Sequence, residues 1–207
     1  MLVDKKVTEF LAETASDSPA PGGGSVAALS GALSAALGTM VCNLTIGKEK
    51  YADVSEELTK IRETMTENMK HLTKLVDDDS NAFNDVMSAF KMPKETDEEK
   101  AKRSAAIQEG YKKAISVPLD TATTSIECMR LLETVAEKGN QNAITDAGTG
   151  ALSAYTGIIA ALLNVKINLG SVKDQDYVAE KQKAVKDLET EARIILDKIL
   201  AIIDKAL

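Results

Sequence analysis

Apolar residues recur at steps of three and four along residues 52–91, and this stripe constrains the fold more than any other feature. An α-helix turns once every 3.6 residues, so side chains three and four positions apart share one face. The stripe consists of Val54, Leu58, Ile61, Met65, Met69, Leu72, Val76, Phe83, Val86 and Phe90. At 1.5 Å per residue such a helix spans about 60 Å. A helix of this length is typical of a bundle.

Shorter periodic segments on both sides predict further helices. Asp4 can cap a short first helix, and Pro118 should kink or split the fourth. The remaining helices are expected over about 24–47, 96–137, 143–168 and from Asp174 or Asp176 to about 206. No strand pattern competes with them. We therefore predict one all-α domain over residues 1–207, a bundle of long antiparallel helices.

Composition and charge narrow the functional classes. The net charge is −7 and no basic block stands out, which argues against nucleic acid as a partner. Cys42 and Cys128 fit neither a disulfide framework nor a metal site, so reduced thiols are expected. The N-terminal sequence has no apolar core of a signal peptide, and the apolar stretch 25–46 is interrupted by Gly, Ser, Thr and Asn. We predict a cytoplasmic protein without a membrane span.

Asp79 falls on the apolar stripe of the long helix, one turn before Phe83. A buried carboxylate is costly unless it is paired or hydrogen-bonded. Asp79 is therefore a partnered structural group, a side chain that a local bend exposes, or a site carboxylate with a raised pKa or a ligand donor to hold. The neighbouring Asp77 and Asp78 are explained as solvated side chains.

The helix over about 143–168 carries a stripe that is small in its middle and polar at its ends. It comprises Asp146, Gly150, Ser153, Gly157, Ala161, Asn164 and Asn168. The small residues allow another helix or a ligand to approach closely. Asp146 and Asn168 lie roughly 33 Å apart at helical rise, so one small ligand cannot touch both in the same chain. Asp146 can also be a first-turn acid that favours the helix dipole.

The second helix shows a comparable stripe of small residues that indicates close helix packing, including a subunit interface. It comprises Ser25, Leu29, Ala32, Ala36, Met40, Asn43 and Gly47. Lys48 and Lys50 follow at the helix end, where the dipole favours cations.

Neither a metal centre nor a phosphate-binding loop is expected. His71 is the only histidine and has no second His or Cys near it. The glycine run at 22–24 lacks the GxxxxGK[ST] pattern and no strand precedes it. Three consecutive glycines nevertheless require a reason, because they cost the most backbone entropy on folding. The run begins a helix, where free N–H groups can also bind an anionic or carbonyl group.

Four blocks of sequence in this order resemble the cyclodeaminase/cyclohydrolase family, which includes the C-terminal half of formiminotransferase-cyclodeaminase and stand-alone methenyltetrahydrofolate cyclohydrolases. The blocks are PAPGGGSVAALSGALSAALGTMVCNLTIGKEKY, LVDDDSNAFNDVMSAFKMPK, GNQNAITDAG and NVKINL. The resemblance covers about residues 3–180. It implies an all-helical, usually dimeric enzyme that acts on one-carbon derivatives of tetrahydrofolate, with or without a polyglutamate tail. It implies no metal and no cofactor beyond the tetrahydrofolate-derived substrate.

Two reactions are compatible with the resemblance. A cyclodeaminase closes 5-formiminotetrahydrofolate to the 5,10-methenyl form and releases ammonia, and a cyclohydrolase opens the methenyl bridge to 10-formyltetrahydrofolate. Both need an acid/base group with a pKa near the working pH. We assign this role to Asp79 or Asp146, with Lys50 as the runner-up; one of the carboxylates can instead bind the pterin edge. The expected substrate-binding residues are Gly22, Gly23, Gly24, Ser25, Asn43, Lys48, Asn164 and Asn168.

Two other hypotheses remain open from the sequence. One is a non-catalytic helical dimer whose small-residue stripes serve packing and interaction only. The other is an enzyme with the same scaffold and a different substrate, because a fold does not determine a function.

Overall fold

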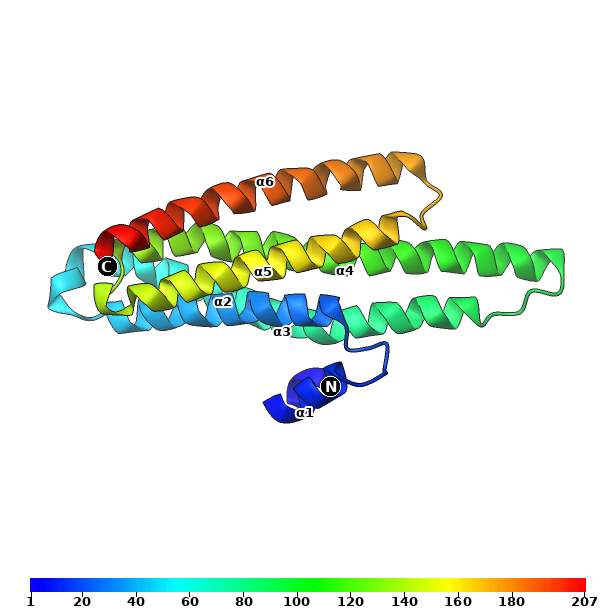
Figure 1. Cartoon of the computed structure of the whole chain (residues 1–207), viewed down its shortest axis with the longest axis horizontal. Helices are drawn as coiled ribbons and strands as arrows, with labels where there is room; N and C mark the ends of the chain where they lie inside the picture. The colour runs from blue at the N-terminus through cyan, green and yellow to red at the C-terminus, as the bar shows by residue number, and fades with distance from the viewer.

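The computed structural model describes residues 1–207 and consists of helices joined by short turns (Figure 1). The α-helices are α1 (Val7–Thr14), α2 (Gly23–Thr45), α3 (Ser55–Phe90), α4 (Asp97–Lys138), α5 (Ile144–Leu169) and α6 (Gln175–Ala206). Three 3-10 helices accompany them: η1 (Leu2–Asp4) precedes α1, and η2 (Glu49–Val54) and η3 (Gln141–Ala143) lie between α2 and α3 and between α4 and α5. The structure has no strand, and the prediction of an all-α bundle of long helices is confirmed.

Helices α2 to α5 run antiparallel to their neighbours in the chain and enclose one hydrophobic core. Helix α6 packs along α4 and α5, η1 contacts α3, and α1 follows η1 outside the group of long helices (Figure 1). Helices α3 and α4 extend beyond the first residue of α2, so the last turns of α3 and the first turns of α4 project past α2 at that end of the molecule (Figure 1).

The backbones of α2 and α5 approach each other closely because both helices carry small residues. A Cβ atom on Gly157 would lie 2.9 Å from the Ala27 carbonyl oxygen and 3.0 Å from the Gly31 nitrogen. Real Cβ atoms rarely come so near to backbone, so this position requires glycine. The small middle of the α5 stripe therefore receives another helix.

The predicted packing face of α2 is rotated from the observed one. The buried positions include Ala28, Gly31, Ala35, Gly38 and Cys42, whereas Met40 and Asn43 are exposed. Ala, Gly and Ser occupy almost every face of this helix, so hydrophobic periodicity does not select one face.

The structure corrects two expectations about helix boundaries, the cap at Asp4 and the split at Pro118. Asp4 does not cap α1; the helix begins after Lys6, whose backbone N–H donates to the Glu9 carboxylate at 3.1 Å. Pro118 does not split α4, which is continuous from Asp97 to Lys138. Proline leaves the carbonyl four residues earlier without its helical partner. That carbonyl, of Ala114, accepts a hydrogen bond from the Asn168 side-chain amide at 3.0 Å, which compensates for the loss.

Two segments are long and apolar enough to cross a membrane by length and composition alone. They are Gly23–Thr45 and Gln141–Leu169, with mean hydropathies of 1.6 and 1.4. Core helices pass the same test, and here both segments pack against each other in the bundle.

Candidate functional site

A cavity of about 440 Å³ lies where the first turn of α2 meets the distal halves of α3, α4 and α5. Its wall includes the segment Pro19–Gly24 without Pro21, and the side chains of Asp79, Asn164 and Asn168. Six of the predicted site residues, Gly22, Gly23, Gly24, Asp79, Asn164 and Asn168, therefore gather around one space. The volume is in the range of pockets that hold small organic ligands.

The Asp79 carboxylate rests on the backbone of Gly24. A Cβ atom at Gly24 would lie 2.1 Å from Asp79 Oδ1, 2.5 Å from Cγ and 2.7 Å from Oδ2. A side chain at residue 24 would displace the carboxylate from this position. The group that approaches the glycine run most closely is thus a carboxylate of the protein itself.

Ser25 lies behind this contact and does not line the cavity. Its side chain is fully buried, and its Oγ lies 3.2 Å from Asp79 Oδ2 and 2.8 Å from the Val76 carbonyl oxygen. The prediction that Ser25 binds substrate directly does not fit this burial, because the hydroxyl is in contact with other protein groups.

Asp79 has the electrostatic character of an acid/base group. Burial raises the pKa of the Asp79 carboxyl above its ordinary value, and hydrogen bonds from the Ser25 hydroxyl and backbone N–H offset part of that rise. Asp79 is also the one charged side chain among the residues that line the cavity. A cationic ligand in this space would find its counter-ion in Asp79.

The two asparagines of α5 are anchored differently. Asn164 donates from its amide nitrogen to the Ala160 carbonyl at 2.9 Å, which leaves its side-chain oxygen without a protein partner. Asn168 donates to the Ala114 carbonyl of α4, as described above. Each amide therefore presents a fixed oxygen-bearing group at the cavity wall.

The aromatic residues that line the cavity were not predicted from the sequence as site residues. Phe83, Phe90 and Tyr111 line it, and the rings of Phe90 and Tyr111 meet edge to face with centroids 6.3 Å apart. Phe83 and Phe90 lie on the same sequence stripe as Asp79, and the pattern was interpreted as core. Phe90 differs from a core residue because α3 extends beyond the start of α2. The Phe90 side chain is therefore 40% exposed.

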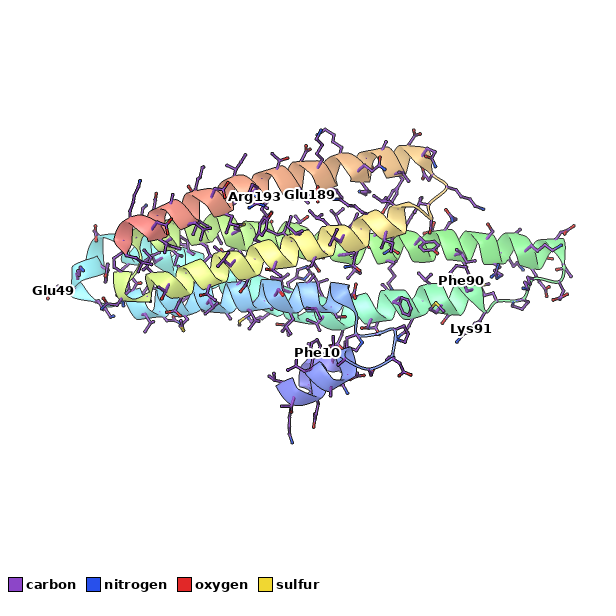
Figure 2. The ribbon with its side chains drawn as sticks, in the orientation of Figure 1. Phe10, Glu49, Phe90, Lys91, Glu189 and Arg193 are labelled. Atoms are coloured by element: carbon purple, nitrogen blue, oxygen red, sulfur yellow. The ribbon has the colours of Figure 1, made fainter.

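The other predicted residues lie at the opposite end of the bundle. Asn43, Lys48 and Lys50 are exposed around the end of α2, and Asp146 is half-buried in the first turn of α5. Figure 2 shows this separation: Glu49, between the two lysines, and Phe90 of the cavity lie toward opposite ends. Asp146 and Asn164 are about 27 Å apart along α5. One copy of the chain does not bring these residues to the cavity.

The histidine and the two cysteines of the chain are either paired with another side chain or buried. His71 Nε2 lies 2.9 Å from Asp120 Oδ2 on α4, and no group of three or more His, Cys, Asp and Glu residues is arranged to hold a metal ion. Both cysteines are free and buried. Burial raises the pKa of Cys42 to about 11 and of Cys128 to about 12, so neither thiol is a ready nucleophile.

Comparison with known sequences gives consistent matches over nearly the whole chain. The family profile described as formiminotransferase-cyclodeaminase matches residues 6–187. A methenyltetrahydrofolate cyclohydrolase of Methylorubrum extorquens is 45% identical over 199 residues, which are 96% of each protein. A formimidoyltransferase-cyclodeaminase of Sus scrofa is 35% identical over 204 residues, but these cover 97% of this chain and only 38% of that protein.

A solved structure has the same fold. The crystal structure of formiminotetrahydrofolate cyclodeaminase from Thermotoga maritima superposes with a TM-score of 0.89 at 28% sequence identity. The match covers 99% of this chain and 98% of that one.

Proposed function

The chain belongs to the formiminotransferase-cyclodeaminase family, and on this premise we propose that it is a methenyltetrahydrofolate cyclohydrolase with Asp79 as its acid/base group. It is an enzyme of folate one-carbon metabolism. The observation that carries the assignment of the site is the half-buried Asp79 carboxylate, held on Gly24 at the wall of the cavity.

The cyclohydrolase reaction is favoured over the cyclodeaminase reaction by two observations. The relative named as a cyclohydrolase matches over 96% of its length, whereas only 38% of the porcine relative is matched. In addition, the methenyl bridge of the cyclohydrolase substrate is a cation, and Asp79 is the one charged side chain that lines the cavity. The cyclodeaminase reaction is the second candidate, because the similar Thermotoga maritima structure bears that name.

The proposed chemistry is proton transfer. Ionised Asp79 takes a proton from the water that adds to the methenyl carbon, and the resulting carboxylic acid returns a proton to N5 as the bond between N5 and that carbon breaks. The carbinol loses its hydroxyl proton when the formyl group forms, so the net products are 10-formyltetrahydrofolate and one proton. A carboxyl group whose pKa burial raises above its ordinary value is suited to both steps.

The cavity also offers a place for the flat rings of the substrate. We propose that Phe83, Phe90 and Tyr111 pack against these rings, while the side-chain oxygen of Asn164 accepts from the N–H edge of the pterin. The substrate carbon is already electrophilic and no electrons are transferred. The absence of a metal or redox cofactor therefore remains our prediction.

The chromophore of methenyltetrahydrofolate provides the test of this function. We expect purified protein to remove its absorbance, with and without a chelator, and to form 10-formyltetrahydrofolate. Appearance of the chromophore from 5-formiminotetrahydrofolate, with ammonia, would instead identify the second candidate reaction. If neither substrate is converted, the proposed function is wrong.

We further propose that the protein is a homodimer formed through exposed apolar residues of α2 and α5. Val26, Leu33, Met40 and Leu44 form one exposed stripe on α2, and Leu152, Leu163 and Ile167 form another on α5. Apolar surface of this kind is typical of an interface. A two-fold axis near Leu33, at the middle of α2, would place the α2 helices of the two copies antiparallel. The first residues of α2 in one copy would then lie near the last residues of α2 in the other copy.

Such a dimer reunites the two separated groups of predicted site residues. Asn43, Lys48, Lys50 and Asp146 of one copy would approach the cavity of the other. Lys48 and Lys50 form no ion pair within the chain, and their ammonium groups match the carboxylates of a folate glutamate tail. Asp146 would then face the substrate from the second copy.

Co-expression of two inactive variants tests this shared site. We expect Asp79→Asn and Asp146→Asn each to lose at least two orders of magnitude in turnover. A 1:1 mixture should regain about a quarter of the wild-type activity, because half of the heterodimer sites carry both intact carboxylates. A monomer by light scattering, or full activity of Asp146→Asn alone, would contradict the shared site while leaving the role of Asp79 in place.

A further inference from the structure

The Ser25 hydroxyl has more hydrogen-bond partners than it has protons. Its Oγ lies 2.8 Å from the Val76 carbonyl oxygen, 3.2 Å from Asp79 Oδ2 and 3.1 Å from Ser80 Oγ. A hydroxyl group donates one hydrogen bond and accepts others. Ser25 is completely buried, so no water reaches its hydroxyl, and its single proton is available either to Asp79 or to the Val76 carbonyl.

These contacts allow two arrangements of protons with the same heavy-atom positions. When Asp79 is ionised, Ser80 donates to Ser25 and Ser25 donates to Asp79. When Asp79 is protonated, its carboxyl donates to Ser25 and Ser25 turns to donate to the Val76 carbonyl. No buried donor or acceptor is left without a partner in either arrangement, which keeps both protonation states available.

We propose that Ser25 is a positioning residue whose hydroxyl rotates between Asp79 and the Val76 carbonyl as Asp79 gains and loses its proton. The backbone of Gly24 limits where the carboxylate can lie, and the Ser25 hydroxyl holds its Oδ2 atom. The carboxylate thus keeps its place against the substrate through the catalytic cycle. The kinetic part of this inference rests on the proposed function; the hydrogen-bond part does not.

The charged neighbours of Asp79 do not provide an alternative control of its titration. On α3, Asp77 accepts from the Leu2 backbone N–H and Asp78 pairs with Lys74 at 2.8 Å. On α4 the titratable group at the cavity is Tyr111, and α2 and α5 contribute Ser25, Asn164 and Asn168, which carry no charge.

The test compares Ser25→Ala with Ser34→Ala, a matched control on the same helix. Ser34 is also fully buried, and its hydroxyl has no hydrogen-bond partner. We expect Ser25→Ala to lower kcat about tenfold or more and to move the acid limb of the kcat/KM profile to higher pH, because the ionised carboxylate loses a donor. Ser25→Thr, which retains the hydroxyl, should restore the profile, and Ser34→Ala should match the wild type.

Titration of the Asp79 carboxyl carbon by NMR, without substrate, separates this inference from the proposed function. We expect its midpoint to rise in Ser25→Ala and to stay unchanged in Ser34→Ala. If wild-type protein hydrolyses no methenyltetrahydrofolate but the midpoint shifts as described, the function fails and the hydrogen-bond role of Ser25 stands. An unchanged midpoint and acid limb in folded Ser25→Ala would overturn the inference.

Discussion

Replacement of Asp79 by Asn is expected to lower kcat/KM for methenyltetrahydrofolate by about two orders of magnitude or more. General acid–base catalysis contributes about 10²–10⁴-fold to typical enzyme rates, and an amide cannot accept the proton of the attacking water. Asn has the shape of Asp, so it fits the space above Gly24. Steady-state kinetics at several pH values should show that the residual rate has lost its acid limb.

The same substitution should not destabilise the fold at neutral pH. Because burial raises the pKa of the Asp79 carboxyl, the folded state binds more protons than the unfolded state between the two pKa values. The wild-type free energy of unfolding therefore falls as the pH rises through the folded pKa. The variant has no carboxyl group at residue 79, so it does not lose stability in this way as the pH rises. Its melting temperature should therefore equal or exceed that of the wild type at pH 7. The difference in melting temperature should vanish below the ordinary carboxyl pKa.

Asp78→Asn is the matched control for this prediction. Asp78 is adjacent in sequence, but its carboxylate pairs with Lys74 on the surface of α3. Such surface pairs contribute little to stability, and the variant should keep wild-type kinetics. Equal, near-wild-type rates for Asp78→Asn and folded Asp79→Asn would show that Asp79 is not the acid/base group.

The helices and the inward direction of Asp79 could be predicted because both are local properties of the chain. A stripe of period 3.6 specifies which residues of α3 face the core, and it placed Asp79 among them. The same argument located Asn164 at the polar end of the α5 stripe, where the structure places it at the cavity.

The contacts between helices could not be predicted in the same way. Periodicity specifies a face but not the partner that covers it, so the contact of Gly24 with Asp79, 55 positions later, has no signal in the pattern. The length of α2 likewise separates Ser25 near its start from Asn43 near its end by about 27 Å at helical rise. That length could have shown that Lys48 and Lys50 do not share a site with the glycine run within one copy.

Gly24→Ala should lose activity while the protein stays folded. The added Cβ would lie 2.1 Å from Asp79 Oδ1, so the carboxylate must move. Misplacement of a reacting group by about 1 Å can cost about 100-fold in rate, and we expect a loss of that size in kcat/KM. The displaced group is the end of a side chain next to an open cavity, and alanine favours the helix by up to about 1 kcal/mol over glycine. The melting temperature should therefore change little.

Gly157→Ala is the matched comparison, because its Cβ would meet backbone atoms at 2.9 Å and 3.0 Å that cannot turn aside. Overpacking of this kind typically costs about 1–3 kcal/mol, so this variant should melt at a lower temperature. In the Asp79→Asn background, Gly24→Ala should add little further loss of activity, since both changes act on one group. An additive loss, or a melting temperature reduced as far as in Gly157→Ala, would mean that Gly24 serves packing rather than the position of Asp79.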